Sequence, residues 1–136
     1  MFNFPHTLLR KVGLFSLVLM FMLTGLNHFG NPDLYVSIIP PYLPLRHELS
    51  YIAGFFEILG AVGLLFAKTR KLSGYALILL LIAIFPANIY MALDPEAFPN
   101  YLPLYIYLRL PAQLIFIAWV YWATLRVKAI GHYDEY

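Results

Sequence analysis

Long apolar runs, separated by short polar or proline-rich segments, dominate the pattern of this chain. Four runs are long enough to cross a bilayer as helices, which takes about 20 residues each. The four runs cover residues 12–29, 50–67, 72–93 and 104–125. The pattern predicts an all-α protein, a bundle of four transmembrane helices that forms a single membrane domain over residues 1–136.

Composition supports a membrane protein. Hydrophobic residues make up 62% of the chain and charged residues only 12%. A soluble core of this length has too little interior to bury so much apolar surface, so the bilayer is the expected surrounding. The net charge of +2 is too small to indicate nucleic-acid binding. The chain has no cysteine, which excludes disulfides, thiol redox chemistry and thiolate metal ligands within it.

Basic residues predict the orientation of the four helices. They gather before the first run, between the second and third, and after the fourth, and all three places lie on one side of the membrane. They are Arg10, Lys11, Lys68, Arg70, Lys71, Arg126 and Lys128. The positive-inside rule then puts both termini in the cytoplasm. Arg46 and Arg109 are exceptions on the outer side. No small-residue cleavage site follows the first run, so we expect an uncleaved helix there, not a signal peptide.

The two outer connections, residues 30–49 and 94–103, are rich in proline. Proline fixes φ and removes a backbone donor, so we expect these connections to be ordered but not regularly helical. Their tyrosines form either an interfacial aromatic belt or a lid over the mouth of the bundle. Residues 40–45 (PPYLPL) resemble residues 99–104 (PNYLPL). Either the two helical hairpins are repeats or the match is a coincidence.

Glu57 is the most informative polar residue, because it interrupts an apolar run. A charged residue at the centre of a membrane helix costs about 2.5 to 3.5 kcal/mol. Small residues three or four positions away share its helix face, namely Ala53, Gly54, Gly60 and Ala61. Small residues mark the face where membrane helices pack closely. We therefore expect Glu57 to point into the bundle.

Other polar residues gather toward the outer side of the four runs, and together they predict a polar pocket in the outer half of the bundle. Its expected members are Thr24, Asn27, His28, Glu57, Asn88, Tyr105, Arg109 and Gln113. Hydrocarbon offers no hydrogen-bond partners, so these groups must satisfy one another or water. Arg109 is the expected partner of Glu57, because a guanidinium matches a carboxylate in two parallel hydrogen bonds. Whether this pair is structural or functional stays open. Proline at position 86 is expected to free the carbonyl of Ile82.

The candidate chemistry does not point to an enzyme. The sequence shows no nucleophile placed with a base and no cofactor loop, so we expect no catalytic residue. Two histidines and two glutamates carry metal-ligand chemistry, but their spacing is not that of a metal site, and no metal is predicted. They are His28, His47, Glu48 and Glu57.

Several short motifs occur in order along the chain. They are Gly25-x-x-His28-Phe29, Ile39-Pro40-x-x-Leu43-Pro44, Gly54-x-x-Glu57-Ile58 and Phe85-Pro86-Ala87-Asn88. In these motifs the chain resembles the DoxX-like family of small four-helix membrane proteins, over about residues 12–125. The resemblance implies a four-helix bundle in a prokaryotic inner membrane, but no single activity. Relatives include a subunit of a thiosulfate:quinone oxidoreductase and a partner of secreted oxidative-stress enzymes. Some redox-associated relatives carry cysteines, so the lack of cysteine here puts a thiol-based role in doubt.

Three functions remain open at this point. The first is a non-catalytic binding or accessory subunit that holds a quinone- or lipid-like molecule, linked to a membrane redox or oxidative-stress system. The second is a structural or assembly partner of another membrane or exported protein, with Glu57 and Arg109 purely structural. The third is a small transporter or proton relay that uses Glu57, although the inner halves of the runs lack polar residues to continue a path. A homodimer is compatible with all three.

Overall fold

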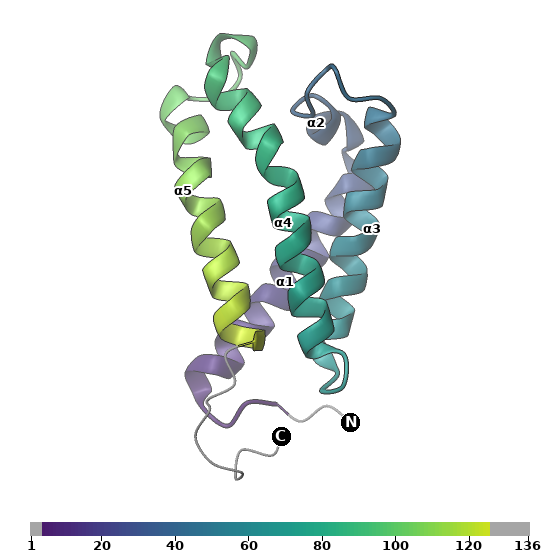
Figure 1. The fold of residues 1–136 in the computed structure, drawn as a ribbon, viewed down its shortest axis with the longest axis vertical. Helices are drawn as coiled ribbons and strands as arrows, with labels where there is room; N and C mark the ends of the chain where they lie inside the picture. Colours follow the sequence, from purple (N-terminus) through teal and green to yellow (C-terminus); the bar gives the residue numbers. More distant parts are fainter. Residues whose placement is uncertain (1–3, 126–136) are drawn as a thin grey trace.

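Four long helices make up most of the computed structural model, which describes residues 4–125 (Figure 1). They are α1 (Leu8–Gly30), α3 (Arg46–Leu65), α4 (Arg70–Leu93) and α5 (Pro103–Val120), the last continued by a π-helical turn, η2 (Tyr121–Leu125). Within the described residues there is no strand. Each long helix, with η2 counted as part of the last, is long and apolar enough to cross a membrane. The predicted all-α architecture with four membrane-spanning candidates is confirmed.

All four long helices begin before the apolar runs that predicted them, whereas α3 ends at Leu65, two residues before its run ends. Helix α1 begins at Leu8 because the Thr7 side chain accepts a hydrogen bond from the Arg10 N–H and caps the helix. Helix α3 begins at Arg46, ahead of the predicted start at residue 50. The apolar pattern marks the part of a helix that matches hydrocarbon, whereas the helix itself continues for another turn.

Both long connections lie at the same end of the bundle, which we call the loop end (Figure 1). The opposite end, with the short turn between α3 and α4, is the turn end. The first connection contains a five-residue helix, α2 (Pro32–Val36), and the second a 3-10 turn, η1 (Pro95–Ala97). The expectation of no regular helix is therefore wrong for α2. Proline is well suited to the first position of a helix, where its missing N–H costs nothing, and Asp33 favours the first turn.

The two similar proline-rich segments take different structures. The first ends just before α3 begins, whereas α5 begins inside the second. Tyr42 of the first is 75% exposed, but Tyr101 of the second packs against Phe98 and Tyr105. The two segments are therefore similar in sequence but not in local structure.

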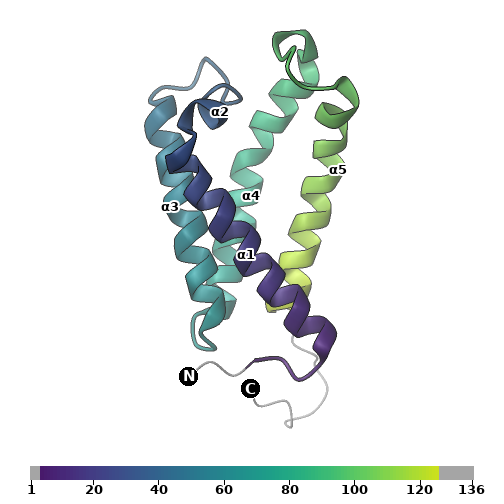
Figure 2. The ribbon, with the colours of Figure 1, turned by 180° about the vertical axis from the view of Figure 1, so that it is seen from behind.

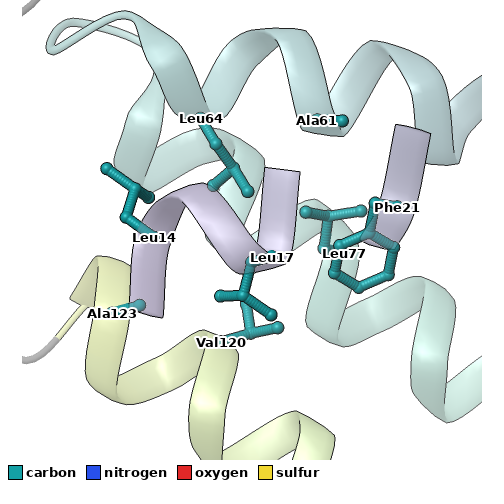
Figure 3. Close-up of a cluster of buried hydrophobic side chains, with 8 residues drawn as sticks. All are labelled: Leu14, Leu17, Phe21, Ala61, Leu64, Leu77, Val120 and Ala123. Atoms are coloured by element: carbon teal, nitrogen blue, oxygen red, sulfur yellow. The ribbon is translucent and has the colours of Figure 1, made fainter. Parts of the chain in front are cut away.

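Neighbouring helices in the chain pack side by side: α1 on α3, α3 on α4, and α4 on α5. Helix α1 runs obliquely across the others, so that its N-terminal part meets η2 at the turn end (Figure 2). The main apolar core lies in that half and takes side chains from all four spans (Figure 3). Its buried members are Leu14, Leu17, Phe21, Ala61, Leu64, Leu77, Val120 and Ala123. A smaller cluster at the loop end consists of Ile38, Met91, Phe98 and Ile106.

Two glycines set the distance between α1 and α3. A Cβ added at Gly54 would lie 2.5 Å from the Cβ of His28 and 2.9 Å from the carbonyl oxygen of Gly25. A Cβ at Gly25 would lie 2.9 Å from the carbonyl oxygen of Gly54. The two backbones are thus in direct contact, as small residues permit between membrane helices.

This contact gives a first prediction. Gly54→Ala should lower the free energy of unfolding by about 1 to 3 kcal/mol, because the methyl group overlaps a packed backbone. Steric-trapping unfolding in bicelles would measure it. Gly30→Ala is the matched control, since a Cβ there meets nothing within 4 Å, and its effect should stay within about 0.5 kcal/mol. Equal effects of the two changes would contradict a close crossing at Gly54.

Candidate functional site

The eight polar residues expected in one pocket divide between two helix pairs. Four belong to α1 and α3, namely Thr24, Asn27, His28 and Glu57. The other four belong to α4 and α5, namely Asn88, Tyr105, Arg109 and Gln113. Within residues 4–125, no hydrogen bond or ion pair joins the first four to the second four. The structure therefore has two polar groups, which we call the α1–α3 group and the α4–α5 group.

Glu57 lies near the middle of the 20-residue helix α3 and is only 6% exposed. Its Oε2 accepts a hydrogen bond of 2.7 Å from the Thr24 hydroxyl. Its Oε1 lies 3.5 Å from Nε2 of His28. Gly54, Gly60 and Ala61 are buried on the same helix face. The expectation that Glu57 faces the bundle interior is confirmed.

The expected ion pair of Glu57 with Arg109 is wrong. The carboxylate is satisfied from α1, and the Arg109 Nε instead donates a hydrogen bond of 3.1 Å to Oδ1 of Asn88 on α4. The reason is the order of the helices around the bundle. Helix α3 packs on α1 and α4, whereas α5 packs on α4, so Glu57 and Arg109 belong to different helix pairs. Charge complementarity in the sequence carries no information about that order.

His28 connects the centre of α3 to the loop end. Its Nδ1 is 3.1 Å from the Ser50 hydroxyl, and the ring is 5% exposed. The Tyr35 ring of α2 stacks on it, with centroids 3.7 Å apart and planes 21° apart. The Asn27 amide donates to the Tyr35 hydroxyl at 2.8 Å. Helix α2 thus covers the loop-end side of the α1–α3 group.

Sequence reasoning did not include Ser50 or Tyr35 among the site residues. For Ser50 a signal was present, because it lies seven residues before Glu57 and two turns of helix put both on one face. For Tyr35 no such signal exists, because the fold of the first connection decides its position.

Ser50, His28 and Glu57 form a serine–histidine–carboxylate series, an arrangement that hydrolases use to activate a nucleophile. A nucleophile must be reached by its substrate, and Ser50 is only 1% exposed. Its hydroxyl is enclosed between α1 and α3, so acyl transfer has no room there. The series is better explained as mutual satisfaction of buried polar groups.

The α4–α5 group is a ladder of hydrogen bonds that ends on Arg109. The Gln113 amide donates to the backbone carbonyl of Leu81, and the Asn88 amide donates to the Gln113 side-chain oxygen. Asn88 then accepts from Arg109, as described above. The bond to Leu81 lies beside the carbonyl of Ile82, where the proline at position 86 removes a helical donor. The sequence predicted a freed carbonyl at Ile82, and the hydrogen bond from Gln113 goes to the carbonyl of the preceding residue, Leu81.

Within residues 4–125, Arg109 is held by a hydrogen bond at only one of its three guanidinium nitrogens. Its guanidinium lies 5.6 Å from the centroid of the Tyr105 ring, and Tyr101 stacks on the same ring at 5.9 Å. The side chain is half-buried. Among the described residues, none accepts a hydrogen bond from its two terminal nitrogens. A fixed guanidinium with two donors available matches an acceptor group with two oxygens.

The four residues with metal-ligand chemistry do not converge. His28 and Glu57 are together, but His47 lies 3.7 Å from Asp33 at the exposed surface. Within residues 4–125 there is no group of three or more His, Cys, Asp or Glu side chains that could hold a metal ion.

Comparison with known proteins gives one match. A family model described as Domain of unknown function (DUF8561) matches residues 17–124. The matched part begins within α1 and ends within η2, so it includes all of α3, α4 and α5 and the larger part of α1. No curated protein and no solved structure matches the chain.

The two separate polar groups give a second prediction, by double-mutant cycles on the free energy of unfolding. Glu57→Gln and His28→Gln should couple by about 0.5 to 3 kcal/mol, because the two side chains are in contact. Glu57→Gln and Arg109→Gln should be additive within about 0.5 kcal/mol, because they share no partner. Strong coupling of the second pair, with additivity of the first, would restore the ion pair expected from the sequence.

Proposed function

The chain belongs to the family described as Domain of unknown function (DUF8561), a description that names no activity, and we propose its function from its own residues. We propose a non-catalytic binding or accessory protein of the membrane. It holds a small amphipathic molecule, a quinone or a lipid, by an oxygen-rich head group at Arg109. The resemblance to the DoxX-like family is in keeping with this role and suggests a link to a membrane redox or oxidative-stress system.

The available donors of Arg109 are the observation that supports this proposal. In the α1–α3 group each polar side chain has a partner: Glu57 contacts Thr24 and His28, and His28 also contacts Ser50. In the α4–α5 group the guanidinium is held at Nε, and no described residue accepts a hydrogen bond from its terminal nitrogens. A phosphate or a quinone carbonyl supplies the acceptor oxygens that such a group binds. The proposed site is therefore centred on Arg109, one of the eight residues of the pocket predicted from the sequence.

The surroundings of Arg109 suit an amphipathic molecule. The residue lies about 9 Å along α5 from its start at Pro103, at 1.5 Å per residue. In a hydrocarbon core about 30 Å thick, this position is in the third nearest the loop end, just below the lipid head groups. Leu104 and Leu108 are exposed on the same helix and offer apolar surface to a tail. A head group at Arg109 can thus keep its tail in lipid.

Binding at Arg109 gives a third prediction. Native mass spectrometry of the protein released from nanodiscs of phosphatidylglycerol, with and without added ubiquinone, should show one retained adduct whose mass identifies lipid or quinone. Arg109→Gln should reduce its occupancy about 10- to 100-fold, since a hydrogen bond to a charged group contributes about 1.5 to 3 kcal/mol.

Glu57→Gln is the matched control for that experiment, because it changes a buried charge in the other polar group. It should lower stability yet keep the adduct. Loss of the adduct in Glu57→Gln, with retention in Arg109→Gln, would place the ligand at the α1–α3 group. A bare, folded wild-type chain in both lipid conditions would count against ligand binding altogether.

For orientation we propose that the loop end faces outward and that both termini are cytoplasmic, in a prokaryotic inner membrane. The basic residues at the turn end support this orientation. Since the natural chain lacks cysteine, single cysteines can test it. In spheroplasts, Tyr42→Cys at the loop end should react with an impermeant maleimide, and Lys71→Cys at the turn end should react only after lysis. The reverse pattern would invert the topology.

A second candidate function is a structural or assembly partner of another membrane or exported protein. The complete internal bonding of Glu57 favours a structural role for that residue in either case. A third candidate, a proton relay through Glu57, rests on the bonded series of Ser50, His28 and Glu57. From Glu57 to the turn end the main core is apolar, which does not favour a continuous path.

A further inference from the structure

One residue of the first connection reaches across to the opposite helix pair. Ile38 follows α2 and belongs by sequence to the α1–α3 side of the molecule. Its side chain is buried in the loop-end cluster with Met91 of α4, Phe98 after η1, and Ile106 of α5. Met91 and Ile106 are fully buried there. Ile38 thus joins the two helix pairs at the loop end, far from the main core.

Arg46 holds the backbone on both sides of Ile38. One terminal nitrogen, Nη2, donates to the carbonyl of Val36 at 2.7 Å and to the carbonyl of Ile39 at 2.8 Å. These bonds bring the end of α2 and the next turn of chain against the start of α3. The segment that carries Ile38 is thus tied to α3 by one cationic side chain, in addition to its own backbone hydrogen bonds.

The loop-end cluster covers the α4–α5 polar group. Met91 lies one helical turn beyond Asn88, toward the loop end, because α4 runs in that direction. Ile106 lies one turn from Arg109 in the same direction, because α5 runs the opposite way. The side chain of Ile38 therefore packs on the residues directly above the hydrogen bond from Arg109 to Asn88.

We propose that Ile38, held by Arg46, is a latch that closes the loop-end approach to Arg109. When Ile38 is seated, the cluster of Met91, Phe98 and Ile106 is sealed, and Arg109 is reached only from the lipid side. When the Ile38 side chain leaves the cluster, water and polar molecules reach the α4–α5 group from the loop end. Control of ligand access by the latch rests on the proposed function of Arg109. The opening of the latch does not depend on that function.

Opening of the latch can be measured with a cysteine placed in the loop-end cluster. Met91→Cys places a single cysteine in the sealed cluster of a chain that has no other. In nanodiscs its reaction with a water-soluble maleimide should be slow. Adding Ile38→Ala or Arg46→Met should accelerate the reaction at least about tenfold, the effect of a population shift of about 1.4 kcal/mol. Adding Arg46→Lys, which keeps a donor cation, should leave the rate near that of the parent.

Leu64→Cys, fully buried in the main core, is the matched control and should react slowly in every background. Hydrogen–deuterium exchange of residues 34–45 should rise in Ile38→Ala without a change in α1. The proposal is overturned if the rate at position 91 does not change. It is also overturned if positions 91 and 64 accelerate together, because the cluster then opens only with the whole fold. A folded wild-type chain without any adduct in mass spectrometry would refute ligand binding but leave these labelling rates unaffected, so the two ideas fail separately.

Discussion

Hydrocarbon offers no hydrogen-bond partner, and that constraint governs the arrangement of every buried polar group in this bundle. Glu57 shows the consequence. Its carboxylate lies in mid-helix, and it is tolerable there because α1 brings Thr24 and His28 to it. That approach is possible only because Gly25 and Gly54 let the two backbones touch. The pairing of α1 with α3 is thus fixed jointly by close packing and by the need to satisfy one acid.

The same constraint produces a second, independent solution between α4 and α5. Gln113 donates to the carbonyl of Leu81, next to the Ile82 carbonyl that lacks a helical donor because of Pro86. Asn88 extends the ladder of hydrogen bonds to Arg109. Each helix pair therefore bonds its polar groups mainly within itself, and only the terminal nitrogens of Arg109 in the α4–α5 group lack an acceptor among the described residues. The two pairs are then joined by apolar contact, through the main core in the turn-end half and through Ile38 at the loop end. In the described part of the chain, the loop-end junction has four buried apolar side chains against eight in the main core, so it is the smaller of the two contacts between the pairs.

Local features of this fold could be predicted well from the sequence. The apolar runs predicted four helices, because length and hydropathy suffice where the surrounding is lipid. The small residues around Glu57 predicted its inward face, because helical spacing alone decides which side chains share a face. The eight candidate residues all lie at the loop-end or central part of their helices. The sequence did not show which helix Glu57 contacts, and the prediction of Arg109 as its partner was wrong.

Sequence alone was enough to predict a membrane protein, the number of its long helices and the polar residues that cannot face lipid. The tertiary structure alone decided how those residues are shared out. Partner choice depends on the order of helices around the bundle and on how closely two backbones approach, and both are properties of packing between segments far apart in the chain. For that reason Glu57 bonds to α1, Arg109 keeps two donors available, and Ile38 from a proline-rich connection packs against α4 and α5 at the loop end.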